Sequence, residues 1–200
     1  WDALCAYLDW SGLRPMTELE FEKACRGPLN PVKREFAFGS SSVTDANTII
    51  NDGKPNEGVS DSIQKGSGLA SHGYLGPKGP LRNGFAANQN SNRLESGASY
   101  WGIMEMSGNL WEQCVSTSKE GSEFSGDHGD GEIIMGLSNV SSWPDKGVGS
   151  GFRGGGWNSG ISLNDFRDLA ISDRYFAFFS NQNARETTGG RGVRKMDLGL

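Results

Sequence analysis

Apolar residues recur at helical spacing at the start of the chain. Leu4, Cys5 and Leu8 fall on one face of residues 2–10, with polar residues between them. A Ser-Gly pair then interrupts the pattern, as is typical of a helix end. The sequence therefore predicts an amphipathic helix over residues 2–10.

A second helix is predicted over residues 17–26. Thr17 and Glu20 stand at the spacing of a capping box, in which each residue satisfies a free backbone N–H group of the other. Glu22 and Arg26 are four residues apart, so we expect an ion pair on the exposed side of this helix.

Residues 28–98 show no sustained period. Gly, Asn, Ser, Asp and Pro dominate this segment, which predicts a long irregular region. Aromatic and β-branched residues gather at 35–39 and 47–51, where we expect short ordered pieces. The glycine-rich stretch 66–80 is predicted to be a surface loop.

The segment 100–113 combines buried-type aromatic residues with a polar bend. A Ser-Gly-Asn turn interrupts its apolar run, and Glu105 and Glu112 stand on either side of the turn. Carboxylates beside carbonyl groups in a tight turn are the oxygen ligands that calcium prefers. The alternative is a plain turn between two strand ends, with both glutamates solvated.

Composition limits the classes of protein to which the chain can belong. The 200 residues include 30 glycines and are 35% hydrophobic, which predicts one loop-rich domain spanning 1–200. The net charge is −5 and no segment gathers the Lys and Arg residues, which argues against a nucleic-acid partner. No apolar run approaches the roughly 18 residues of a membrane span. Because the chain opens abruptly at Trp1, directly at a predicted helix, we expect a truncated N-terminus.

Cysteine and histidine offer little for metal or disulfide chemistry. Cys5, Cys25 and Cys114 are too few and too scattered for a disulfide framework or a zinc cluster, and buried free thiols are favoured. A bridge between Cys5 and Cys25 stays open if the two helices pack together. His72 and His128 are far apart in the sequence.

Two further glycine-rich segments have the composition of a calcium-binding or phosphate-binding loop but lack the corresponding motif. The acidic loop 120–132 has its aspartates at the wrong offsets for an EF-hand. The run 151–158 is followed by neither Lys-Ser nor Lys-Thr, so it is not a phosphate-binding loop. Its triple glycine is better explained by backbone passing close to the rings of Trp111 and Trp157.

Four motifs in order resemble the sulfatase-modifying-factor, or formylglycine-generating-enzyme, family. They are the segments 14–27, 102–112, 152–158 and 189–194, which carry RPMTELEFEKACRG, GIMEMSGNLWE, FRGGGWN and GGRGVR. The resemblance covers nearly the whole chain. It implies an α+β fold of the C-type lectin-like kind, with short antiparallel strands, two N-terminal helices and much irregular loop.

The resemblance also implies where catalytic residues would stand. The copper-binding cysteines of formylglycine-generating enzymes correspond to Ser159 and Asn164, and neither residue supplies the thiolate that Cu(I) requires. Iron-dependent relatives, the sulfoxide synthases, use a histidine cluster, whereas this chain has only His72 and His128. No copper or iron site is expected in this segment, although residues upstream could complete an oxidoreductase.

The residues of this chain match the calcium-ligand positions of the family better than its copper-ligand positions. The ligand positions beside the Gly-Asn-x-Trp-Glu motif correspond to Glu105, Gly108, Leu110 and Glu112. The alternative is that the two glutamates are solvated or paired with Arg153 or Arg191. A second family site would use Asn47 and the carbonyl group of Thr48.

The resemblance therefore favours a non-catalytic, calcium-stabilised module that binds a protein or glycan ligand. Related scaffolds display a C-terminal recognition surface, and Tyr, Phe, Asn and Arg in a loop are typical of such surfaces. The candidate residues are Trp157, Asn158, Arg174, Tyr175, Phe176, Asn181, Asn183 and Arg185. Alternatively, Phe176, Phe178 and Phe179 belong to the core. Two other functions stay open, a metal-dependent oxidoreductase and an architectural subunit of an extracellular or phage assembly; an extracellular, cell-surface or virion location is favoured.

Overall fold

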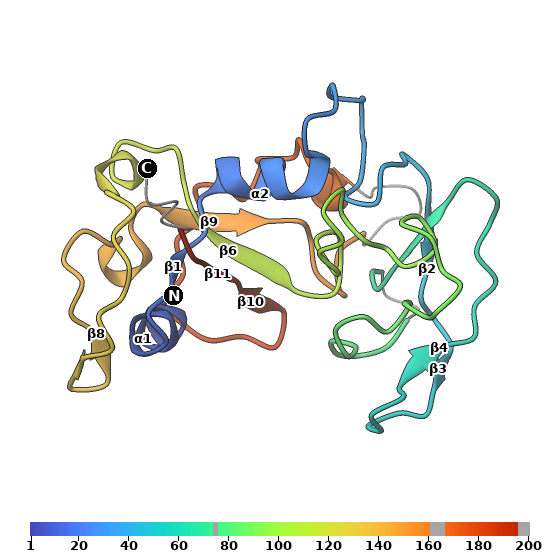
Figure 1. Cartoon of the computed structure of the whole chain (residues 1–200), viewed down its shortest axis with the longest axis horizontal. Coiled ribbons are helices and arrows are strands. Elements are labelled where there is room, and N and C mark those ends of the chain that lie inside the picture. Colours follow the sequence, from blue (N-terminus) through green and yellow to red (C-terminus); the bar gives the residue numbers. More distant parts are fainter. Residues whose placement is uncertain (74–75, 161–166, 196–200) are drawn as a thin grey trace.

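A computed structural model describes residues 1–73, 76–160 and 167–195 of the chain (Figure 1). The fold is α+β and loop-rich, with two α-helices near the N-terminus and several small sheets. The helices are α1 (Asp2–Trp10), α2 (Glu18–Arg26) and the short 3-10 turns η1 (Gly121–Glu123), η2 (Asp145–Gly147) and η3 (Arg167–Leu169). In these ranges no helix has the length and apolar character needed to cross a bilayer.

The strands are short and pair in both directions. They are β1 (Arg14–Pro15), β2 (Val43–Asp45), β3 (Ile49–Ile50), β4 (Gly58–Val59), β5 (Gly68–Ala70), β6 (Trp111–Val115), β7 (Ile133–Ile134), β8 (Leu137–Ser138), β9 (Ser150–Arg153), β10 (Thr188–Gly190) and β11 (Gly192–Val193). The pairs β1–β11, β3–β4, β6–β9 and β7–β8 are antiparallel, as expected. The pairs β2–β5 and β6–β10 are parallel, which the antiparallel prediction missed.

Strand β6 is the centre of the largest sheet, whose order is β10-β6-β9. Glu112 on β6 stands opposite Arg153 of β9 on one side and Gly189 of β10 on the other. Beside this sheet, β1 pairs with β11, with Arg14 opposite Val193, so the two ends of the described chain meet. The sheet thus joins segments that are far apart in the sequence.

The predicted helices form where the local signals placed them. At the start of α2, the backbone N–H of Glu20 donates to Thr17 Oγ1 at 3.1 Å, and that of Thr17 donates to Glu20 Oε2 at 3.0 Å. The helix ends at Gly27, where φ is 65° and a Cβ would lie 2.2 Å from the Tyr100 ring. Only glycine fits such a position.

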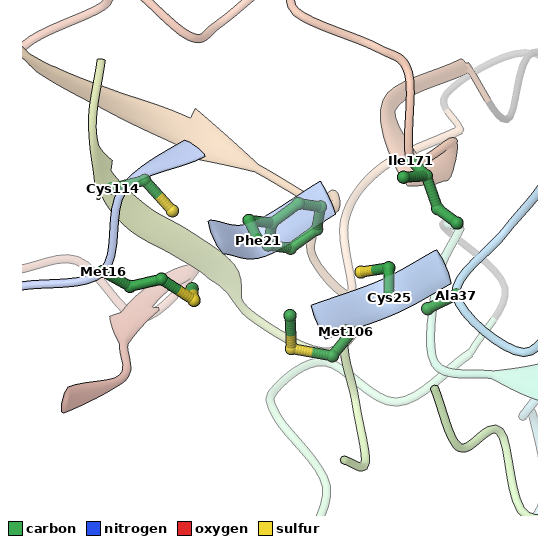
Figure 2. Close-up of a cluster of buried hydrophobic side chains, with 7 residues drawn as sticks. All are labelled: Met16, Phe21, Cys25, Ala37, Met106, Cys114 and Ile171. Carbon is green, nitrogen blue, oxygen red and sulfur yellow. The ribbon is translucent and has the colours of Figure 1, made fainter. Parts of the chain in front are cut away.

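The core under α2 is rich in sulfur. Figure 2 shows Phe21 among Met16, Cys25, Ala37, Met106, Cys114 and Ile171. Cys5 belongs to a separate cluster with Trp1, Leu8, Val115 and Trp143. All three cysteines are free and buried, so the Cys5–Cys25 bridge is not formed. Burial raises the pKa of Cys5 to about 12 and raises those of the other two thiols as well.

The stretch 66–80 corrects a prediction. It was expected to be a surface loop, yet β5 within it is fully buried and pairs with β2. A Cβ on Gly68 would lie 2.2 Å from the Phe38 ring, so the glycine allows that ring to cover the strand. The stretch 35–39, which contributes Phe38, is ordered and buried as expected, and 47–51 contains strand β3.

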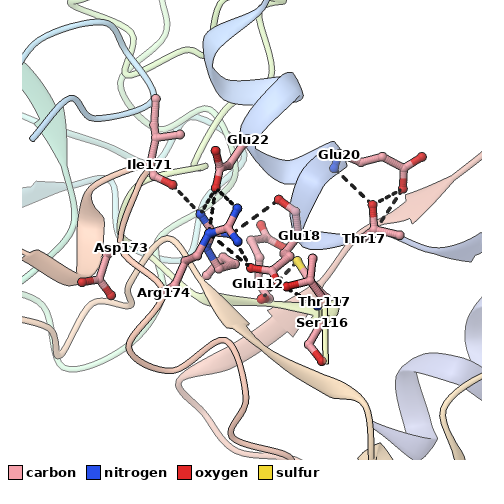
Figure 3. A network of polar contacts seen from close by, with 12 residues as sticks. Thr17, Glu18, Glu20, Glu22, Glu112, Ser116, Thr117, Ile171, Asp173 and Arg174 are labelled. Atoms are coloured by element: carbon pink, nitrogen blue, oxygen red, sulfur yellow. Dashed lines mark hydrogen bonds and ion pairs between the residues drawn. The ribbon is translucent and has the colours of Figure 1, made fainter. Parts of the chain in front are cut away.

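A buried ion network fixes α2 onto the sheet (Figure 3). The fully buried guanidinium of Arg153 donates to Glu18 Oε2 at 2.9 Å, to Glu22 Oε1 at 3.0 Å and to the carbonyl oxygen of Ile171. Arg174 donates to the same Glu22 oxygen at 2.8 Å. The network therefore joins two cations and two carboxylates, of which Arg153 and Glu18 are fully buried and Arg174 is 41% exposed.

The ion pair Glu22–Arg26 was predicted to lie on the exposed side of α2, and this placement is wrong. Its N–O distance is 3.6 Å, and only 10% of the Arg26 side chain and 21% of the Glu22 side chain are exposed. Arg26 is bonded instead to Glu35 at 3.1 Å, and Glu22 turns toward Arg153 and Arg174. The i,i+4 pattern was correct, but the tertiary partners lie elsewhere in the sequence.

Substituting Arg153→Leu is expected to destabilise the protein strongly. The change leaves the carboxylate of Glu18 buried without its cation, which costs about 3–5 kcal/mol in the free energy of unfolding. Arg174→Ala is the matched control, because 41% of that side chain is exposed and the loss should stay below about 1 kcal/mol. Urea denaturation measures both. Equal losses would contradict the assignment of Arg153 as the central cation.

Candidate functional site

Two cavities lie at the central sheet, and the first is acidic. This acidic cavity has a volume of about 400 Å³. Its polar lining consists of Asn83, Glu105, Asn109, Glu112 and Arg191, and Leu110 contributes to its wall. Three of the four predicted calcium ligands, Glu105, Leu110 and Glu112, therefore come together here. The fourth, Gly108, is next to Asn109 in the chain but is not on the cavity wall.

The Ser-Gly-Asn turn builds one side of this cavity. Gly108 has φ 85°, and a Cβ there would lie 2.5 Å from the Ser71 carbonyl oxygen, so no other residue fits. Asn109 also has positive φ, at 65°. Its side chain accepts from Leu81 N at 2.8 Å and donates to Leu81 O at 3.1 Å. The turn thus fixes the segment around Leu81 against the start of β6.

Glu112 is buried with one oxygen left over. Arg191 Nε donates to Glu112 Oε1, and Arg191 also donates to the Met104 carbonyl at 2.7 Å. The other oxygen, Glu112 Oε2, is buried and has no hydrogen-bond partner among the residues that the structure describes. Burial raises the pKa of this carboxyl, and the charge of Arg191 opposes the rise. Of the two arginines considered from sequence, Arg191 is the partner of Glu112.

Glu105 completes a carboxylate pair. Its backbone has φ 58°, and its Oε1 accepts from Gly84 N at 2.9 Å. Burial raises the pKa of Glu105 to about 7, and the nearby charge of Glu112 adds to the rise, while Gly84, Arg191 and Arg82 oppose it. Two buried carboxylates with an unpartnered oxygen suit a hard divalent cation.

The remaining ligands of such a cation would be neutral oxygens. No group of three or more His, Cys, Asp or Glu side chains placed to hold a metal occurs in the described parts of the chain. Asn83, which lines the cavity, was missed from sequence because it lies in the irregular region with no motif around it. Carbonyl, amide and water oxygens commonly complete a calcium shell.

Beside Asn47 and Thr48, the residues of the expected second family site, lies a carboxylate that sequence analysis also missed. Asp61 Oδ2 accepts from Asn47 N at 3.0 Å and from Thr48 N at 2.8 Å. No local pattern connects residues 14 positions apart in an irregular segment.

The second cavity is lined by aromatic rings, and we call it the aromatic pocket. It also has a volume of about 400 Å³. Its rings are Trp111, Phe152, Phe176 and Phe179, and its polar groups come from Asn158, Ser180, Asn181, Arg185, Thr187 and Thr188. The Trp111 and Phe176 rings meet edge to face, with centroids 5.1 Å apart. A Cβ on Gly156 would lie 2.9 Å from Trp111 Cδ1, which supports the expected role of the triple glycine.

Four of the eight residues predicted to bind ligand line this pocket: Asn158, Phe176, Asn181 and Arg185. The others lie outside its lining. Trp157 donates its indole N–H to Glu186 O at 3.1 Å, Arg174 is paired with Glu22, and the backbone of Asn183 donates to Asn181 Oδ1 at 2.9 Å. Tyr175 is 70% exposed and stacks near Phe179 with an interplanar angle of 22°.

The three phenylalanines of the segment 176–179 differ in burial. Phe176 is half-buried, whereas Phe178 and Phe179 are 58% and 55% exposed. Trp111 and Phe152 were not predicted as pocket residues, because their motifs pointed only to packing. Phe179 belongs to the stretch 174–185, which was expected to form the recognition surface. The pocket arises where strands β6 and β9 meet the loop that follows residue 171.

Ser159, which the resemblance aligns with a copper ligand of the family, forms hydrogen bonds with the backbone. Its hydroxyl accepts from Gly156 N at 3.0 Å, its carbonyl accepts from Gly73 N at 2.7 Å, and only 4% of the residue is exposed. Asn164 lies outside the described residues. His72 is buried, which lowers its pKa to about 4, and His128 Nε2 accepts from Lys195 N at 2.9 Å.

Glu105 should make the stability of the metal-free protein depend on pH. Its folded-state pKa of about 7 exceeds the ordinary 4.5, so between these values the folded protein holds a proton that the unfolded chain has lost. Stability therefore falls as pH rises through this window. Glu105→Gln should reduce the fall, to which the raised pKa of Glu112 also contributes, and raise the free energy of unfolding at pH 8 by on the order of 2–3 kcal/mol.

Urea denaturation of chelator-treated protein between pH 5 and about 8 tests this. The exposed Glu123→Gln is the control and should keep the wild-type profile. If wild type and Glu105→Gln lose stability in parallel across the window, the raised pKa of Glu105 is not its source.

Comparison with known families places the chain. Residues 1–196 match the model described as the Sulfatase-modifying factor enzyme 1-like domain. A search of curated proteins found no match. The matched range includes both cavities and nearly every residue of the chain. The chain therefore belongs to the sulfatase-modifying factor family.

Proposed function

We propose that this domain is a ligand-binding module, stabilised by calcium in the acidic cavity, that recognises its ligand through the aromatic pocket. The observation that carries the proposal is the pocket itself. Its walls are aromatic, and it presents amide, hydroxyl and guanidinium groups from four neighbouring segments. A concave apolar site with a few convergent polar groups is the usual form of a ligand site.

Binding is favoured over thiol chemistry by the residues around the pocket. Ser159 stands at a copper position of the family, and its hydroxyl is already bonded to the backbone. Cys25 and Cys114 are buried in the core, and their raised pKa values keep them as thiols. A soft metal needs thiolate ligands, which these groups do not supply.

Calcium is supported by Glu105 and Glu112. An ion between them would satisfy the unpartnered Oε2 of Glu112 and offset the repulsion between the carboxylates. The same ion would also help to fix the aromatic pocket, because successive residues of a strand face opposite sides of the sheet. Glu112 lines the acidic cavity and Trp111 lines the aromatic pocket, so an ion that fixes one fixes the other.

An architectural role is a second candidate, and one surface favours it. The β7–β8 hairpin carries Ile134, Met135 and Leu137 with exposed fractions of 60%, 96% and 51%. Exposed Trp10 lies on α1, which packs against this hairpin. Contiguous exposed apolar residues commonly mark a contact with another protein.

Calcium should raise the melting temperature of the chelated protein. At 100 times its Kd, a ligand of the folded state adds about 2.7 kcal/mol of stability. For a chain of this size that amounts to roughly 5–10 °C. Glu105→Gln should lose most of this shift, and Glu123→Gln should keep it.

Thermal melts with and without calcium measure the effect, and magnesium serves as the ion control. An unchanged melting temperature would contradict the calcium site. Stoichiometric copper or iron in the purified protein, with oxygen consumption on a thiol substrate, would favour the oxidoreductase instead.

The aromatic pocket should bind a member of a glycan and peptide array. Phe179→Ser removes a wall of the pocket and should weaken that binding at least about tenfold, because the loss of a buried ring contact is worth more than about 1.4 kcal/mol. Phe178→Ser is a matched control, since Phe178 is as exposed but does not line the pocket. If the two variants bind alike, or nothing on the array binds, the pocket is not the recognition site.

A further inference from the structure

Arg185 differs from the other arginines around the central sheet. The guanidinium groups of Arg153, Arg174 and Arg191 are all bonded to carboxylates. Arg185 is exposed at the edge of the aromatic pocket, and no acceptor in the described residues receives a hydrogen bond from its side chain. A cation that the fold leaves without a counter-ion is available to a ligand.

The rest of the pocket lining carries no charge. Its polar groups are the amides of Asn158 and Asn181 and the hydroxyls of Ser180, Thr187 and Thr188. Within the described parts of the chain, Asn158 Oδ1 is buried and receives no hydrogen bond, so this amide also has unused hydrogen-bonding capacity. With one cation and no anion on its wall, the pocket favours an anionic ligand over a cationic one.

The aromatic surface extends beyond the pocket. Phe179 lines it, and Tyr175 stacks near Phe179 at a centroid distance of 6.3 Å and lies 70% exposed. Both rings meet Phe176 edge to face, so the aromatic surface continues from the pocket past its rim. A pyranose ring suits such a surface, because it has a C–H face for contact with aromatic rings and hydroxyls at its edge for amide groups.

From these features we propose that the pocket binds an acidic glycan through a uronic-acid residue, whose carboxylate pairs with Arg185. A guanidinium and a carboxylate form two parallel hydrogen bonds, which fix the orientation of the sugar as well as its charge. The sugar ring then lies against the aromatic wall, and Asn158 and Asn181 are within the same lining to receive its hydroxyls. This inference rests on the proposed function of the pocket and adds the class of ligand.

Calorimetric titration with two matched probes tests the proposal. One is an oligosaccharide ending in glucuronic acid, and the other is the same oligosaccharide ending in glucose. The acidic probe should bind at least about tenfold more tightly, a difference of about 1.4 kcal/mol, and the preference should shrink as salt is added. Arg185→Gln should abolish the preference without removing binding of the neutral probe. Arg194→Gln, an exposed arginine outside the pocket, should change neither.

The outcomes separate this inference from the function on which it rests. A preference that survives Arg185→Gln, or equal binding of both probes, overturns the carboxylate pairing. If neither sugar binds but an acidic peptide does, in a manner that needs Arg185 and Phe179, the glycan is wrong and the ligand-binding function stands. If no glycan or peptide binds and Phe179→Ser has no effect on any ligand, both are overturned.

Discussion

The buried guanidinium of Arg153 is the interaction on which the rest of the structure depends. An unpaired charge in the interior is prohibitively costly, so Arg153 requires Glu18, Glu22 and the carbonyl group of Ile171 around it. These partners, labelled in Figure 3, come from α2 and from the segment that leads into residues 174–185, which we call the aromatic loop. The single cation on β9 therefore fixes a helix, a sheet and the start of the aromatic loop in one geometry.

Strand β6 contributes to the walls of both cavities. It lies between β9 and β10, and its alternation turns Trp111 toward the aromatic pocket and Glu112 toward the acidic cavity. Arg191 directly follows β10 and donates a hydrogen bond to Glu112. Thr188, the first residue of β10, and the preceding Thr187 line the aromatic pocket. The same two strands thus supply residues to both sites, and a displacement of either strand would be felt at both.

Local signals in the sequence were enough to locate part of this arrangement. The capping box of α2, the glycine turn at Gly108 and the carboxylates Glu105 and Glu112 are recognisable within short windows, and each lies where it was expected. The failures have a common physical cause. Glu22 is bonded to Arg153, 131 residues later, and β5 is buried because Phe38 covers it. Long-range partners of this kind leave no periodic trace in the chain.

The lining of the aromatic pocket was half predicted for the same reason. Asn158, Phe176, Asn181 and Arg185 have the composition of a binding loop, so sequence alone singled them out. Trp111 and Phe152 have the composition of core residues, and only their placement beside the aromatic loop makes them pocket walls. A residue type indicates what a side chain can do, whereas the pairing of distant strands decides where it does it.

The pairing of β1 with β11 has a consequence for how the protein folds. Arg14 and its strand partner Val193 are separated by nearly the whole described chain. The entropic cost of closing a loop of that length must be met before the two strands pair, and contacts of this kind slow folding. Because Gly190 and Gly192 lie against Leu4 and Leu8, the apolar face of α1 stays uncovered until this late step, and a partly folded chain in that state is prone to aggregate.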